Sequence, residues 1–299
     1  MRGPILIAGD GRSGTTLLSV ILDANPGLAV GPELHLRGPK DLGHYILEAI
    51  EIWRCSSSEQ WDELRYHSEL RNAFHFVQRA ARFGVEPLTL RDIINARVDA
   101  GSKLESFEER CLLVEDIAKH KAFNQNASMW GFKIMRDLPL YEKYMNCWPN
   151  ALFIHIVRDG RDVAASQMID HAGWGYDNIR LAAEGWCKMI SVAEELPEDQ
   201  VLEIRYEDLI IDTENVTKTL CDFVGVAWAK DMLNHTEHQS VFLANHYKHP
   251  SGEQVRKPLF TNSIGRYKKE LSPDHICEFE DIASSCLIKY GYLAHARKS

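Results

Sequence analysis

The sequence predicts an α/β fold in which a doubly wound, mostly parallel sheet is flanked by helices. Two continuous apolar runs, residues 5–8 and 151–157, have the composition of central parallel strands, because strands covered on both faces show no polar alternation. Each run leads into a polar, glycine-containing turn and then into a segment with helical character. Strands that alternate with helices along a chain are typical of parallel sheets.

The first strand, turn and helix unit spans residues 5–25. Apolar residues recur at helical spacing after the turn until Asn25-Pro26-Gly27 ends the helix. Further strands are expected at 130–134 and 201–205, and further helices from about residue 163, at 178–195 and at 214–224. Residues 36–128 contain no strong strand run, so they are predicted to form a largely helical insertion over the sheet edge.

Composition excludes several classes of protein. The chain has 299 residues, 45% of them hydrophobic, and no repeats, so one domain over residues 1–299 is expected. A net charge of −9 disfavours nucleic acid and anionic membranes as partners, and no run is apolar enough to insert stably in a bilayer. Seven scattered cysteines without a CxxC pair indicate reduced thiols and a cytoplasmic location. No cluster has metal-ligand spacing, so no metal is expected.

The turn after the first strand has the features of a phosphate-binding loop. Glycines let backbone N–H groups converge on an anion at a helix N-terminus. Arg12 adds a positive charge and the hydroxyl residues add donors; the candidate binding residues are Arg12, Ser13, Gly14, Thr15 and Thr16. The pattern GxxxxGK[ST] is not met because its lysine is missing, which disfavours a P-loop ATPase or GTPase.

Arg-Ser-Gly-Thr-Thr, followed by a leucine-rich helix and Asp-Ala-Asn-Pro, resembles the 5′-phosphosulfate loop of sulfotransferases that use 3′-phosphoadenosine-5′-phosphosulfate (PAPS). The resemblance implies a P-loop-type fold and PAPS as co-substrate. Leu17 stands where cytosolic members carry a tryptophan that stacks on adenine.

Residues 154–166 resemble the family's 3′-phosphate motif, which implies that Arg158 and Ser166 bind the 3′-phosphate. Taken alone, the charged turn at 158–162 favours a solvated cluster with local ion pairs, and the resemblance reverses this preference. Two further segments extend the resemblance. Arg205-Tyr206-Glu207-Asp208-Leu209 implies a role for Tyr206 on the adenine side, and the segment 263–267 implies that Ser263 and Arg266 close over the nucleotide.

The catalytic residues are predicted partly by the same resemblance. Trp130-Gly131-Phe132-Lys133 is similar to a segment of bacterial and tyrosylprotein-type sulfotransferases whose lysine approaches the transferred group. Arg12 and Lys133 are the expected cations at the bridging and leaving oxygens. The acceptor hydroxyl needs a general base, and Glu33 matches the catalytic glutamate of that branch, with His35 as the alternative.

The sequence therefore predicts a PAPS-dependent sulfotransferase that acts on a hydroxyl of a small molecule, sugar or lipid. The helical insertion at 36–128 is the expected binding region for this acceptor. A P-loop small-molecule kinase using ATP–Mg²⁺ and a non-catalytic nucleotide-binding module stay open as alternatives. The oligomeric state is not specified by any motif.

Overall fold

A computed structural model of the chain describes residues 3–34, 36, 42–55, 70–169, 175–237, 255–259 and 261–294. Its centre is a parallel sheet with the strand order β2-β3-β1-β4-β5. The strands are β1 (Ile5–Ala8), β2 (Leu28–Gly31), β3 (Met129–Met135), β4 (Leu152–Val157) and β5 (Val201–Arg205). Four of them confirm the predicted strands. β2 was not predicted, because four residues directly after the Asn-Pro-Gly turn are too few to show a period.

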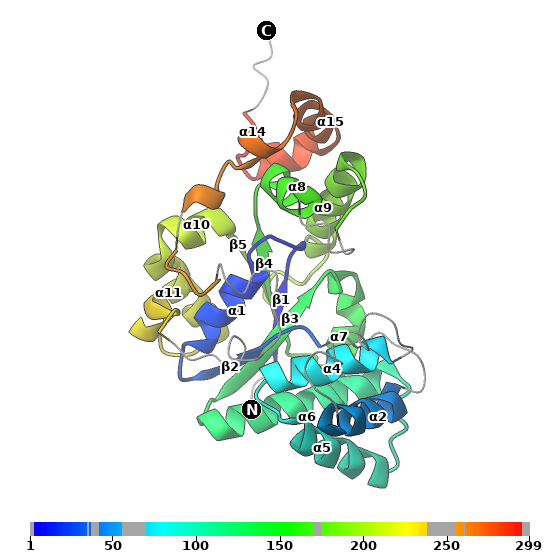
Figure 1. Cartoon of the computed structure of the whole chain (residues 1–299). Coiled ribbons are helices and arrows are strands. Elements are labelled where there is room, and N and C mark those ends of the chain that lie inside the picture. The colour runs from blue at the N-terminus through cyan, green and yellow to red at the C-terminus, as the bar shows by residue number, and fades with distance from the viewer. Residues whose placement is uncertain are drawn as a thin grey trace.

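Helices cover both faces of this sheet, as the doubly wound prediction requires (Figure 1). Ile5 and Ile7 of β1 pack in one apolar cluster with α1 (Thr15–Asp23), α10 (Tyr206–Ile211) and α11 (Thr213–Val224). Leu6 and Ala8 point to the other face and join a second cluster. Alternate side chains of a strand lie on opposite faces, so both sets are buried and the run reads as continuously apolar.

The second cluster contains the predicted insertion, whose described residues form helices between β2 and β3. These are α2 (Leu42–Cys55), α4 (Arg71–Arg82), α5 (Pro87–Asp99) and α6 (Phe107–Gln125). They gather together beside the β2–β3 side of the sheet (Figure 1). None of the helices in the described ranges is long and apolar enough to cross a membrane.

A third group of helices lies beyond the carboxyl end of β4. It consists of α8 (Gly160–Ile169), α9 (Ile179–Ala193), α14 (Tyr267–Glu270) and α15 (Pro273–Lys289), which share an apolar cluster. The remaining elements are α7 (Tyr141–Cys147) and the short helices η1 (Leu138–Leu140), η2 (Lys230–Asn234) and η3 (Thr261–Ser263). The predicted helices at 178–195 and 214–224 are confirmed as α9 and α11, and the one expected from residue 163 begins at Gly160.

Candidate active site

The loop between β1 and α1 lies at the point where the chain crosses from one half of the sheet to the other, which is where open α/β sheets bind ligands. Gly14 is the N-cap of α1 with a φ of 100° and makes no side-chain cap hydrogen bond. A Cβ at Gly14 would lie 2.5 Å from the Tyr206 ring, so glycine is required there both for its backbone and for this contact. The helix N-terminus thus keeps the geometry that suits an anion.

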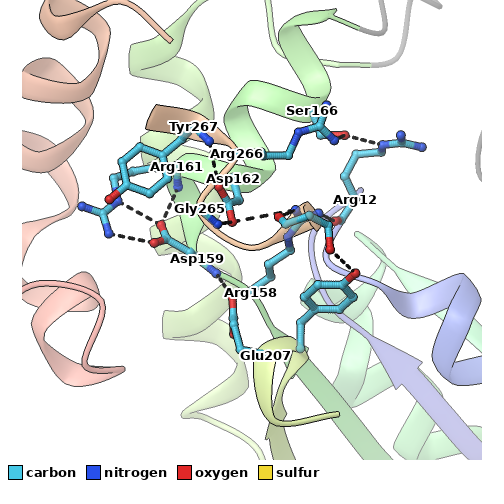
Figure 2. Close-up of polar contacts among 12 residues, drawn as sticks. Arg12, Arg158, Asp159, Arg161, Asp162, Ser166, Glu207, Gly265, Arg266 and Tyr267 are labelled. Carbon is cyan, nitrogen blue, oxygen red and sulfur yellow. Dashed lines mark hydrogen bonds and ion pairs between the residues drawn. The ribbon is translucent and has the colours of Figure 1, made fainter. Parts of the chain in front are cut away.

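Ser166 connects the two predicted phosphate motifs. Its hydroxyl accepts a hydrogen bond from Nε of Arg12 at 2.9 Å and another from Nη1 of Arg266 at 3.3 Å. The three residues come from the first loop, from α8 and from the segment before α14, and Figure 2 shows the two guanidinium groups meeting at Ser166. Two cations around one buried hydroxyl form a site suited to a phosphate or sulfate group.

Arg158 joins the same site from the end of β4. Its Nη1 donates to the Arg12 carbonyl at 2.9 Å and its Nη2 donates to the Ser263 carbonyl. The guanidinium lies 4.8 Å from the centre of the Tyr206 ring, and the Tyr206 and Ser263 hydroxyls are 2.8 Å apart. Residues distant in sequence, all predicted to contact the nucleotide, therefore lie together.

The charged turn that follows Arg158 is not a solvated cluster, which corrects that alternative from the sequence. Asp162 is fully buried and accepts the backbone N–H groups of Gly265 at 2.8 Å and Tyr267 at 2.9 Å. Burial raises the pKa of Asp162, and these two N–H groups and Arg158 oppose the shift. Asp162 thereby attaches the segment at 263–267 to the 3′-phosphate motif (Figure 2).

The turn is also fixed from the carboxy-terminal side. Arg161 is buried and bonds both carboxylate oxygens of Asp159, at 3.0 and 2.7 Å, and also the Tyr292 carbonyl at 2.8 Å. The Asp159 N–H donates to Glu207, whose other oxygen accepts from the Tyr292 hydroxyl at 2.7 Å. Sequence reasoning missed Glu207 and Tyr292, since nothing local to them indicates a partner in the 158–162 turn.

Lys133 and Glu33 form the second part of the site. Nζ of Lys133 lies 2.7 Å from Oε2 of Glu33 and donates to the Thr16 hydroxyl at 3.0 Å. The lysine side chain is only 1% exposed. Burial lowers the pKa of Lys133; Glu33 opposes this shift, and the neighbouring guanidinium groups of Arg82 and Arg79 add to it.

Helix α4 reaches the same carboxylate. Nη2 of Arg79 lies 3.4 Å from Oε1 of Glu33. The helix approaches closely because Gly31 leaves room for the Phe83 ring, which would lie 2.1 Å from a Cβ at that position. Glu33 is thus held by two cations, Lys133 from β3 and Arg79 from the insertion. The alternative base, His35, lies outside the described residues.

Comparison with known proteins identifies the family of this chain. A model of the sulfotransferase family matches residues 4–230, well over half of the chain. The chain belongs to the sulfotransferase family. A protein-tyrosine sulfotransferase of Drosophila melanogaster is 25% identical over 290 residues, covering 93% of this chain and 50% of that protein. The chain therefore spans about half the length of this relative.

Solved sulfotransferase structures share the fold. The sulfotransferase domain of the Synechococcus PCC 7002 olefin synthase gives a TM-score of 0.62 at 22% identity, over 95% of this chain and 96% of that one. A mouse sulfotransferase complexed with PAP (3′-phosphoadenosine-5′-phosphate) gives 0.51 at 13% identity, over 98% and 89% of the two chains. The chain has the P-loop-type fold of the sulfotransferase family, and membership of this family does not favour the kinase alternative.

Polar contacts beside the first loop were not indicated by the sequence. Asp10 forms a partly buried ion pair with Arg136, and Gln167 of α8 lies beside it. The order of β1 and β3 in the sheet, which no local pattern reveals, brings Asp10 and Arg136 together. His155 is a buried residue of β4, and its Nδ1 lies 2.8 Å from Glu203.

Proposed function

We propose that this sulfotransferase transfers the sulfuryl group of PAPS to an acceptor hydroxyl by in-line displacement and releases PAP. The observation that carries the proposal is the position of Lys133. Its ammonium group contacts both Thr16 of the predicted donor loop and Glu33, the predicted base, at 3.0 and 2.7 Å. Negative charge develops on the transferred group and its leaving oxygen during sulfuryl transfer, and a cation between donor and base can stabilise that charge.

In this proposal the donor lies along the carboxyl edge of β1 and β4. The loop residues Arg12 to Thr16 hold the 5′-phosphosulfate through N–H groups and hydroxyls. Arg158, Ser166 and Arg266 hold the 3′-phosphate, with Tyr206 and Ser263 beside the nucleoside. The existing contacts of Ser166 with Arg12 and Arg266 support this assignment, because the cations already face one hydroxyl.

The reaction needs one proton transfer and one displacement. Glu33 takes the proton of the acceptor hydroxyl, whose oxygen attacks the sulfur atom. The bond between sulfur and the bridging oxygen breaks, and its electron pair stays on the 5′-phosphate of PAP. Lys133 and Arg12 stabilise that oxygen. For this step Lys133 exchanges Glu33 for donor oxygens, which frees the carboxylate to act as a base.

The acceptor is proposed to be a small molecule, sugar or lipid bound between the sheet edge and the helical insertion. The contact between Arg79 of α4 and Glu33 supports this placement, since it brings the insertion to the proposed base. All seven cysteines are free thiols, which supports a cytoplasmic location as part of the same proposal.

Thermal unfolding with added ligands tests the donor assignment. PAP at a hundred times its dissociation constant is expected to stabilise the protein by about 2.7 kcal/mol, whereas ATP–Mg²⁺ is not. Stabilisation by ATP–Mg²⁺ without any effect of PAP would revive the kinase alternative. Radiolabelled PAPS offered with hydroxyl acceptors then separates an enzyme from a nucleotide-binding module, because only an enzyme yields a sulfated product.

A further inference from the structure

A buried polar cluster lies behind the phosphosulfate loop, and the proposed mechanism gives it no part. Its centre is Asp10, the residue between β1 and the loop, whose side chain is 1% exposed. Nε of Arg136, just after β3, donates to Oδ1 of Asp10 at 2.7 Å. Nε2 of Gln167, in α8, lies 3.4 Å from Oδ2. Three elements that surround the donor loop therefore meet at one carboxylate.

This cluster, together with Arg158, fixes the backbone on both sides of Arg12. Oδ1 of Asp10 accepts the Gly11 N–H at 2.7 Å, and the Gly11 carbonyl accepts from Nε2 of Gln167 at 2.8 Å. The next carbonyl, that of Arg12, accepts from Arg158 at 2.9 Å. Arg12 has a φ of 72°, a left-handed conformation that a residue with a side chain keeps only when its surroundings hold it. The held peptide groups supply that restraint and aim the Arg12 side chain at Ser166.

The charges of the cluster have a second consequence. A buried carboxylate directly before an anion-binding loop repels the ligand unless a cation cancels it. Arg136 is the cation placed to do so, and its guanidinium lies over the Tyr176 ring, 4.4 Å from the ring centre. Asp10 can therefore hold the loop backbone in place without repelling a phosphate bound there.

We propose that Asp10, Arg136 and Gln167 are positioning residues of the donor site. Asp10 and Gln167 hold Arg12 in its left-handed conformation, and Arg136 cancels the charge of Asp10 so that the loop accepts an anion. The charge-cancelling part rests on the proposed binding of PAPS. The restraint on the loop is a property of the protein alone.

A charge-rescue experiment tests the electrostatic part, with PAP binding followed by titration calorimetry. Arg136→Gln leaves the Asp10 carboxylate uncompensated, and PAP affinity is expected to fall about tenfold or more. Adding Asp10→Asn removes the charge and keeps an oxygen for the Gly11 N–H, so the double variant is expected to regain most of the lost affinity. If the double variant binds PAP as weakly as Arg136→Gln does, this part is overturned. The affinity would then have fallen because contacts of Arg136 were lost, and removal of the Asp10 charge cannot restore those contacts.

Hydrogen exchange without ligand tests the restraint. Gln167→Leu removes the donor to the Gly11 carbonyl and is expected to speed exchange in a peptide covering residues 9–16. The matched control is Gln200→Leu, which removes an amide that donates to the Pro149 and Ala151 carbonyls and is expected to leave that peptide unchanged. Unchanged exchange in Gln167→Leu would overturn the restraint. If the unmodified protein binds no PAP, the proposed function fails, and faster exchange in Gln167→Leu would still establish the restraint.

Discussion

Glu33→Gln is the substitution that most directly separates chemistry from binding. It removes the proposed base and retains the size of the side chain and one oxygen acceptor for Lys133. A general base contributes about 10²- to 10⁴-fold to turnover, so the rate of sulfuryl transfer is expected to fall by that factor. PAP affinity is expected to be equal or slightly higher, because Lys133 loses a competing anion at 2.7 Å.

The structure also sets the stability cost of this substitution. Glu33 is 13% exposed and Lys133 is 1% exposed, so the variant leaves a buried ammonium group without its carboxylate. Breaking a buried pair costs about 3–5 kcal/mol, and the retained amide oxygen places the expected loss near the lower value. Domains are typically stable by about 5–15 kcal/mol, so the variant is expected to fold. Urea unfolding measures this loss.

Asp23→Asn is the matched control. Asp23 forms a buried ion pair with Lys121, also at 2.7 Å, with exposures of 2% and 3%. Asp23 ends α1 and is remote from the loop that begins this helix. The control is expected to lose similar stability and to keep its turnover. A parallel loss of turnover and PAP affinity in Glu33→Gln would refute the base assignment and make Glu33 a structural residue.

Three further predictions concern the donor site. Arg158→Ala is expected to weaken PAP binding by about 2 kcal/mol, roughly thirtyfold. Calorimetry with adenosine 5′-phosphosulfate, which lacks the 3′-phosphate, provides the contrast, and an equal loss of affinity for that ligand would refute the 3′-phosphate assignment. Burial lowers the pKa of Lys133 from its ordinary value of 10.5, so turnover is expected to decline with rising pH earlier than an ordinary lysine titrates. Lys133→Arg stays charged and is expected to move this decline to higher pH in a pH–rate profile. Removal of divalent metals with EDTA is expected to leave turnover unchanged, and a steep loss would support ATP–Mg²⁺ chemistry instead.

Local pattern in the sequence was enough for much of the fold. The apolar runs at 5–8 and 151–157 are found as β1 and, apart from Ala151, as β4, because strands buried on both faces have no polar positions. β2 was not predicted because the four residues 28–31 are too few to show the hydrophobic periodicity of a strand. The charged turn at 158–162 was ambiguous for another reason: the sequence of an ion pair is the same whether it is buried or solvated.

By itself, the sequence determined the loop of Arg12 to Thr16, the motif of Arg158 and Ser166, and the resemblance to PAPS-dependent sulfotransferases, since these depend on residues adjacent along the chain. The tertiary structure alone decided that Lys133 lies 2.7 Å from Glu33 and that Arg136 lies 2.7 Å from Asp10. These contacts join the ends of β1, β2 and β3. The order β2-β3-β1 that brings those ends together is fixed by packing between segments far apart in sequence, which no local pattern records.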